Sequence, residues 1–216
     1  RSAGVMLTCP NTHGFFEPRV ADIAALAHEV GALMYYDGAN LNAIMGRCRP
    51  GDLGFDVMHF NLHKTFGTPH GMGGPGSGAV AVNECLVPYL PSPRVVKTEQ
   101  GYALGDAEKT MGKMSPFFGS FLIGVRAYAY IRALGGEGLK TASGMAVLNA
   151  NYVLRRLRDT YPAAYEGWCM HECLLTAAGL TARKGVRALD IAKALLDRGF
   201  HAPTVYFPLT VKEDLM

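Results

Sequence analysis

Apolar residues along this chain recur with two different periods, and each period predicts a kind of element. Four short apolar runs, each bounded by glycine, proline or polar residues, predict buried strands. The runs span residues 3–8, 33–37, 56–60 and 78–82. Between the first two runs, residues 19–30 carry apolar side chains at helical spacing, and Gly31 follows where a helix C-cap is expected. Strand, helix and strand in this order predict a βαβ crossover with parallel strands.

The second half of the chain has a different pattern. Prolines at 88–93 are expected to break any regular element, and the polar stretch 97–113 is expected on the surface. Two long helical patterns follow, separated by Gly135 and Gly136, and then a strand–helix–strand pattern. These patterns cover 117–134 and 139–157, then 169–175, 188–198 and 204–207. We therefore expect a large domain over residues 1–135, and a linking helix with part of a smaller domain over 136–216.

Composition narrows the class of protein. With 49% hydrophobic and 18% charged residues the chain is globular, and a net charge of +3 without a long basic run does not favour nucleic acid. No apolar run reaches 18 residues and no signal-peptide pattern opens the chain, so no membrane role is expected. Five scattered cysteines, an odd number, favour reduced thiols. A soluble intracellular enzyme is expected, in the bacterial cytoplasm or the mitochondrial matrix.

Candidate chemistry lies where two of the predicted strands end. Asp37 ends the run 33–37, and Lys64 follows the run 56–60. The carboxyl ends of parallel strands are where open α/β sheets present a site. Pyridoxal phosphate needs a lysine that binds its aldehyde as a Schiff base, and a carboxylate that keeps its pyridine nitrogen protonated. The alternative is an ordinary strand-end aspartate and a solvated lysine.

Three longer motifs carry a resemblance to a known family. They are YYDGANLNAIMG at 35–46, DVMHFNLHKTFGTPHGMGGPGSGAV at 56–80 and LDIAKALLDRGFHAPTVYFPL at 189–209. The chain resembles the P-protein of the glycine cleavage system, the pyridoxal-phosphate-dependent decarboxylating glycine dehydrogenase. The resemblance covers nearly all 216 residues and is strongest to the C-terminal half, or to subunit 2 of the two-subunit form.

The resemblance implies an α/β, fold-type I transferase-like fold with a mainly parallel sheet in the large domain and the start of a small C-terminal α/β domain. It implies pyridoxal 5'-phosphate as a covalent aldimine at Lys64, with Asp37 on the pyridine nitrogen. Further cofactor contacts are expected from Ala39 under the ring if the strand continues, Asn11 at the phenolic oxygen and Asn61 at the phosphate. His63 is expected beside the cofactor or as a support for the lysine's backbone. The implied partners are glycine, the lipoylated H-protein, and a second P-protein subunit or half.

Two further patterns in the sequence, a dinucleotide fingerprint and a possible metal cluster, would indicate other functions. Gly71, Gly73 and Gly76 match a dinucleotide fingerprint, but Pro75 interrupts it and a strand follows, so we reject that reading. Cys169, His171 and Cys173 would share one face of a strand, yet no clear fourth ligand lies near, and no metal is expected.

Rival functions are another fold-type I enzyme, such as an aminotransferase or a lyase, and a non-catalytic interface piece. Because the chain begins at a strand deep in the large domain, we also expect a part of a longer polypeptide that binds the cofactor weakly in isolation.

Overall fold

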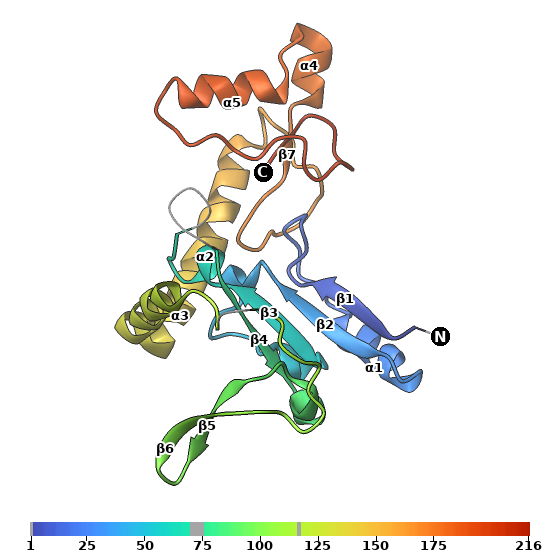
Figure 1. Cartoon of the computed structure of the whole chain (residues 1–216). Helices are drawn as coiled ribbons and strands as arrows, with labels where there is room; N and C mark the ends of the chain where they lie inside the picture. Colours follow the sequence, from blue (N-terminus) through green and yellow to red (C-terminus); the bar gives the residue numbers. More distant parts are fainter. Residues whose placement is uncertain (1, 70–75, 116–117) are drawn as a thin grey trace. The chain divides into compact units, whose positions relative to one another are not determined.

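The computed structural model describes residues 2–69, 76–115 and 118–216, and the chain forms two compact units (Figure 1). Unit 1 comprises Arg1–Thr8, Arg19–Leu41 and Cys48–Gly136, and unit 2 comprises Cys9–Pro18, Asn42–Arg47 and Glu137–Met216. The last break between the units lies next to the expected boundary at residue 135. Two earlier segments join unit 2, so the simple two-domain division of the chain stays a prediction.

Unit 1 is built on a four-stranded sheet in the order β1-β2-β3-β4. The strands are β1 (Gly4–Thr8), β2 (Leu33–Gly38), β3 (Val57–Asn61) and β4 (Gly78–Val82). The first three strands are parallel and β4 is antiparallel to β3. The four strands expected from the apolar runs are confirmed within a residue at each end, and the sheet is mixed with a parallel majority.

One face of the sheet is buried and the other is not. Alternate residues of β2, Met34 and Tyr36, are fully buried. Helix α1 (Val20–Glu29) contacts β2 and buries Val20, Ala24 and Ala27, three residues at helical spacing. The intervening β2 residues, Leu33, Tyr35 and Asp37, are exposed or half-buried because successive side chains of a strand point to opposite faces. Asp37 therefore lies on the less covered face.

Asp56, in the loop before β3, ties several elements of unit 1 together. Its Oδ2 accepts hydrogen bonds from the Met34 amide and from His28 Nε2, both at 2.8 Å, and its Oδ1 accepts one from Asn83 Nδ2 at 2.6 Å. Burial of Asp56 acts to raise the pKa of its carboxyl, but these hydrogen bonds outweigh it, and the net pKa lies below the usual value. The carboxylate is thus a structural anchor for α1, β2 and the end of β4.

The segment between β4 and the long helix differs from expectation. A 3-10 helix, η4 (Glu84–Tyr89), runs through Pro88, and a hairpin of β5 (Arg94–Thr98) and β6 (Gly101–Gly105) occupies the stretch expected as irregular surface. Shorter helical turns are η1 (Leu41–Ala43), η2 (Pro50–Leu53) and α2 (Leu62–Thr65). The hairpin was missed because its strands are mostly exposed and their apolar residues stand side by side, as Val95 and Val96 do, so that they lack the apolar alternation of a half-buried strand.

Helix α3 (Phe121–Leu157) is interrupted at Gly135, whose φ of 62° and ψ of −177° are outside the helical range. This confirms the two helical patterns that the sequence separates at Gly135 and Gly136. The backbone conformation at Gly135 is one that residues other than glycine rarely adopt. The first part of α3 belongs to unit 1 and the part after Gly136 to unit 2.

Unit 2 has a small core between short elements. The strands β7 (Leu175–Thr176) and β8 (Asp214–Leu215) pair antiparallel, beside α4 (Ala178–Lys184) and α5 (Ala188–Leu196). Leu175, Ala177, Ala188 and Leu215 form the buried cluster. Two expected strands are largely wrong: of 169–175 only Leu175 lies in a strand, β7, and of 204–207 only Val205 makes a bridge, to Leu215.

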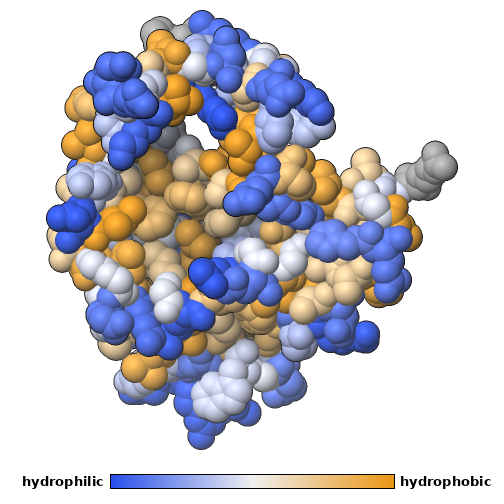
Figure 2. Space-filling view, turned by 90° about the horizontal axis from the view of Figure 1, so that it is seen from below, coloured by the Kyte–Doolittle hydropathy of each residue, from blue (hydrophilic) through white to orange (hydrophobic). Residues whose placement is uncertain are grey.

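Large apolar side chains remain exposed in unit 1, and the visible face in Figure 2 shows apolar patches between charged ones. Among those most exposed are Tyr102 at 77%, Phe121 at 80% and Leu122 at 75%. Exposed apolar patches are typical of surfaces that contact another polypeptide. Across the described residues, no helix has both the length and the apolar character needed to cross a membrane.

Candidate functional site

Asp37 lies at the carboxyl end of β2, between Thr8 of β1 and His59 of β3 in the sheet register. Its side chain is 30% exposed. The carboxylate Oδ1 accepts a hydrogen bond from the Ala39 amide at 3.0 Å, which closes a turn directly after the strand. The turn orients the carboxylate at the edge of the sheet where open α/β folds bind ligands.

Gly38, the last residue of β2, permits a close approach of β2 to β3. A Cβ atom at this position would overlap with the carbonyl oxygen of His59. Only glycine therefore fits this strand end without moving β3. The close approach fixes Asp37 relative to His59.

Lys64 follows β3 on the single helical turn α2, so it lies beyond the strand rather than on it. Its side chain is exposed and forms no ion pair or hydrogen bond within the part of the chain that the structure describes. The carboxyl ends of β2 and β3 are neighbours, because Gly38 pairs with Phe60. The structure thus brings the acid and the amine to the same edge of one sheet.

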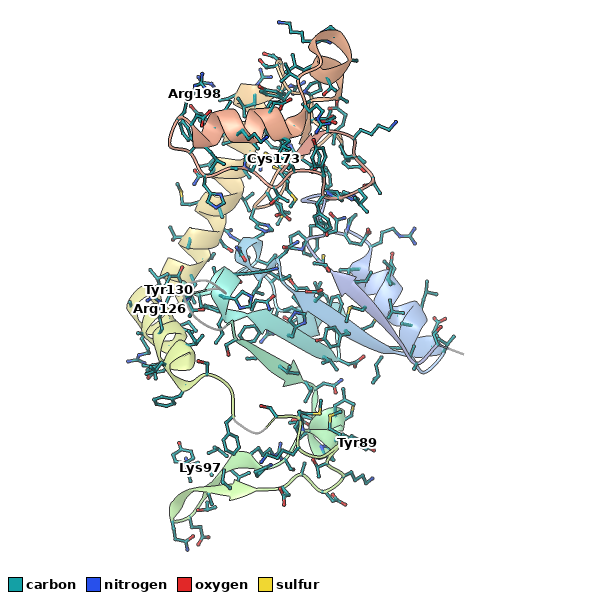
Figure 3. The ribbon with its side chains drawn as sticks, turned by 45° about the horizontal axis from the view of Figure 1, so that its top comes forward. Tyr89, Lys97, Arg126, Tyr130, Cys173 and Arg198 are labelled. Atoms are coloured by element: carbon teal, nitrogen blue, oxygen red, sulfur yellow. The ribbon has the colours of Figure 1, made fainter. Side chains whose placement is uncertain are left out.

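The residues that follow Lys64 are held by the first part of α3. Arg126 Nε donates a hydrogen bond to the Gly67 carbonyl at 2.7 Å, and the Tyr130 ring meets the Phe66 ring edge-on with centroids 6.4 Å apart. Figure 3 labels Arg126 and Tyr130 on this part of the helix. Because Thr65 and Phe66 are buried, the lysine projects from an anchored turn.

His63 and Lys64 do not alternate as strand residues, because both lie on the helical turn. A strand period, which would place the two side chains on opposite faces, therefore does not apply to them. His63 Nδ1 lies 3.3 Å from the Ser77 amide nitrogen and 3.1 Å from the Ser77 carbonyl oxygen. His63 thus joins α2 to the residue before β4, and a contact with a cofactor stays a prediction.

The other expected cofactor ligands have clear local roles. Asn61 is the last residue of β3, pairs with Gly78, and makes no side-chain cap on α2. The strand β2 ends at Gly38, so the condition for Ala39 to share a face with Asp37 is not met, and its amide holds Asp37 instead. In unit 2, Asn11 Oδ1 accepts hydrogen bonds from the His13 and Phe15 amides and shapes its own turn. The roles of all three toward a cofactor stay predictions.

Two side chains beside Asp37 were missed from the sequence. His59 Nε2 lies 3.4 Å from Asp37 Oδ1, and His59 Nδ1 lies 2.9 Å from the Tyr35 hydroxyl. Burial of Tyr35, and then the nearby charge of Asp37, raise the pKa of the Tyr35 hydroxyl. The available signal was the strand period, because Tyr35 stands two residues before Asp37, and His59 two before Asn61.

The cluster Cys169, His171 and Cys173 lies on irregular backbone rather than on one strand face. Burial, and then the charges of Cys173 and Glu172, raise the pKa of the Cys169 thiol to about 11, and burial lowers the pKa of His171. The described residues hold no group of three metal-ligating side chains. The glycine-rich stretch at 70–76 lies outside the described residues except for Gly76, where a Cβ atom would lie 3.1 Å from His63 Nδ1.

Solved structures share this fold at low sequence identity. A cysteine desulfurase from Thermococcus onnurineus NA1, in its apo form, superposes with a TM-score of 0.64 at 14% identity, over 94% of this chain and 50% of that one. Mouse CSAD superposes with a TM-score of 0.64 at 16% sequence identity, and the match covers 98% of this chain and 46% of that one. The structure of Oryza sativa TDC with PLP superposes with a TM-score of 0.62 at 16% identity, and the match covers 93% of this chain and 40% of that one. The class is therefore clear: the chain has the fold of fold-type I pyridoxal-phosphate enzymes.

Sequence relatives narrow the class to a family. Residues 142–216 match the family model described as "Glycine dehydrogenase, C-terminal domain". A probable glycine dehydrogenase (decarboxylating) subunit 2 of Thermosipho africanus is 57% identical over 215 residues, which is 99% of this chain and 45% of the relative. The corresponding protein of Thermotoga maritima is 56% identical over 214 residues, which is again 99% of this chain and 45% of the relative. Nearly the whole chain is therefore similar to glycine dehydrogenase (decarboxylating) subunit 2, and it spans just under half the length of these curated relatives.

Proposed function

We propose that the chain supplies the lysine and the aspartate of a pyridoxal-phosphate-dependent glycine decarboxylase that passes an aminomethyl group to the lipoyl arm of the H-protein. The observation that carries this proposal is the meeting of Asp37 and Lys64 at one sheet edge, in a chain 57% identical to a glycine dehydrogenase subunit. A different fold-type I activity fits the fold equally well, but it does not account for that identity.

The side chains at this edge fit pyridoxal phosphate. Asp37 Oδ1 accepts a hydrogen bond from the Ala39 amide. Asp37 Oδ2 makes no hydrogen bond within the described residues, so this oxygen is available to accept one from an N–H donor. Lys64 offers an amine that forms no ion pair with any residue the structure describes, which suits covalent attachment of an aldehyde. When bound, pyridoxal phosphate supplies a protonated pyridine ring that withdraws electrons from the α-carbon of an amino acid.

In this function the two residues have different tasks. Asp37 Oδ2 would hold the proton on the pyridine nitrogen, and Lys64 Nζ would hold the cofactor and, once glycine has displaced it, serve as the proton-transfer group. The bond between the glycine carboxyl and its α-carbon breaks and carbon dioxide leaves. The aminomethyl group bonds to one sulfur of the lipoyl disulfide, and the other sulfur becomes a thiol.

The partners belong to the same proposal. The relatives are called subunit 2, and the exposed apolar side chains of unit 1 support contact with a second glycine dehydrogenase polypeptide. Glycine and the lipoylated H-protein follow from the activity. A cytoplasmic location is proposed from the bacterial relatives and from five cysteines that form no disulfide.

The covalent assignment is tested by borohydride reduction of the intact protein with its cofactor, followed by peptide mapping. We expect the pyridoxyl label on Lys64, loss of the visible absorption band in Lys64→Ala, and retention of the band in the control Lys97→Ala. Lys97 suits this purpose because it is an exposed lysine on β5, away from the sheet edge. A label on Lys97 or Lys113 would contradict the assignment.

The reaction is tested by exchange of labelled bicarbonate into glycine, with H-protein present. Asp37→Asn keeps the shape but removes the charge that stabilises the pyridine N–H. Exchange should fall on the order of a hundredfold or more, the scale of lost electrostatic stabilisers, while the coloured cofactor stays bound. Near-normal exchange in this variant would remove Asp37 from the mechanism, and exchange specific for another amino acid would favour a different fold-type I activity.

A further inference from the structure

The two oxygens of Asp37 have different surroundings. Oδ1 accepts a hydrogen bond from the Ala39 amide at 3.0 Å and lies 3.4 Å from His59 Nε2. The second distance is longer than an ordinary N–H···O hydrogen bond, so this contact is mainly electrostatic. Oδ2 makes no hydrogen bond among the described residues. One oxygen is therefore held by the protein and the other is open.

We propose that Tyr35 and His59 form a positioning pair that fixes Asp37 through Oδ1, so that Oδ2 is presented to the ring nitrogen of the cofactor. This rests on the proposed function, because it names how that site is held. Neither side chain is assigned a contact with glycine. Their effect is on the orientation and the charge of Asp37.

The donors and acceptors of the pair determine where each proton lies. A carboxylate only accepts hydrogen bonds, so Nε2 has to face Asp37 as the donor, and the Tyr35 hydroxyl then donates to His59 Nδ1 across 2.9 Å. A neutral imidazole carries one proton, and a hydrogen bond received at Nδ1 leaves that proton on Nε2. His59 therefore turns an N–H toward Asp37 Oδ1 rather than a lone pair, which would repel the carboxylate.

The sheet explains why these three side chains meet. Asp37 and His59 are direct partners in the β2–β3 register, and Tyr35 lies on the same face of β2 two residues earlier. Tyr35 and His59 are thus diagonal neighbours across the two strands, a separation that aromatic side chains can bridge. Their ring centroids are 5.7 Å apart and tilted by 43°, so the rings contact at an angle and do not stack in parallel. The polar contact, rather than ring stacking, sets the orientation of His59.

The first test uses Tyr35→Phe and His59→Phe in the intact protein with pyridoxal phosphate. Both variants keep an aromatic ring and remove only polar atoms, and Tyr102→Phe on exposed β6 is the matched control. Cofactor affinity and kcat for glycine should each fall roughly 3- to 10-fold, as for one lost hydrogen bond, with KM for glycine unchanged. Unchanged affinity and kcat in both variants would overturn the proposal.

The double variant separates a pair from two independent packing residues. If Tyr35 acts through His59, adding Tyr35→Phe to His59→Phe should cause no further loss. Multiplied losses would show that Tyr35 does not act on Asp37 through His59, and would overturn the pairing. Unfolding midpoints of all variants show that the fold is retained.

A spectroscopic measurement tests the pair without the cofactor's chemistry. Nitrogen NMR of the His59 ring should show the proton on Nε2 in the unmodified protein, and a mixture of both tautomers in Tyr35→Phe. A proton on Nδ1 in the unmodified protein would overturn the proposal. If Lys64 carries no cofactor but the Nε2 tautomer is found, the proposed function fails while the pair stands, so the two failures are distinguishable.

Discussion

Two aspartates of unit 1 have opposite surroundings, and the difference separates a structural carboxylate from one available to a ligand. Asp56 is 11% exposed and accepts hydrogen bonds from a backbone amide, a histidine and an asparagine. The side chain of Asp37 is 30% exposed, and one of its oxygens has no hydrogen-bond partner among the residues that the structure describes. A carboxylate whose oxygens are already bonded contributes to stability, whereas an open one at a sheet edge is ready to bind a donor.

The role of Asp56 predicts a pH-dependent stability. Its pKa in the folded state lies below the unfolded value, so its contribution is present above the unfolded pKa and is lost as pH falls through the folded one. At pH 7, Asp56→Asn should destabilise by about 1–3 kcal/mol, because buried donors lose their acceptor. In urea unfolding the difference from the unmodified protein should shrink below about pH 4.

The control for this prediction is Asp52→Asn. Asp52 pairs with Arg49 on the surface, with side chains 58% and 84% exposed, so its replacement should change little at any pH. A destabilisation by Asp56→Asn that is equally large at pH 7 and in acid would contradict the linkage.

At the scale of elements, the residues of the candidate site are positioned by the carboxyl ends of the strands rather than by the strand centres. The three parallel strands bring Thr8, Asp37 and His59 into one row across the sheet. Gly38 lets β2 and β3 remain close at this row, and α3 holds the turn that carries Lys64. The site therefore depends on a backbone approach as well as on its functional side chains.

Gly38→Ala tests this dependence. A methyl group here would meet the His59 carbonyl, so β3 must shift, and we expect a destabilisation of about 1–3 kcal/mol with weaker cofactor binding. Gly51→Ala is the matched control, since a Cβ at Gly51 meets nothing within 4 Å. Chemical denaturation should show Gly51→Ala unchanged or slightly more stable. Equal stability of the two variants would refute the close approach.

At the scale of the whole molecule, the two units share a partly apolar surface but have different cores. Large apolar side chains are exposed in both, among them Phe121 in unit 1 and Leu209 in unit 2, and unit 1 buries alternate residues of β2 beside α1. Unit 2 has the small cluster around Leu175, with short strands and two helices. The five cysteines are distributed over both units, with Cys9 and Cys169 buried and Cys85 exposed.

This distribution predicts the order in which the thiols react. At neutral pH, iodoacetamide should label Cys85 first, because the thiolate is the reactive form and exposure controls access. Cys169, with a pKa raised to about 11 by its burial, should react last in the folded protein and become reactive in urea. Mass spectrometry of timed samples measures the order, and Cys85→Ser should remove the fast phase. Early labelling of Cys169 would contradict the buried position.

The sequence by itself determined the features that depend on neighbouring residues. The strands β1 to β4, helix α1 and the break at Gly135 follow from local apolar periods and glycine positions. The positions of Asp37 and Lys64 after two buried strands also follow from the sequence, because each apolar run ends at or shortly before a polar residue. Their roles toward a cofactor stay predictions.

Only the tertiary structure decided the features that depend on pairing between distant segments. His59 opposite Asp37, the antiparallel direction of β4 and the exposed hairpin β5–β6 come from long-range register. The segment 169–173 has an alternating pattern without a strand, because a strand also needs a partner to accept its backbone hydrogen bonds. Local periodicity determines which face of an element is apolar. Which other element pairs with it depends on contacts between segments that are distant in the sequence, and these form only in the folded chain.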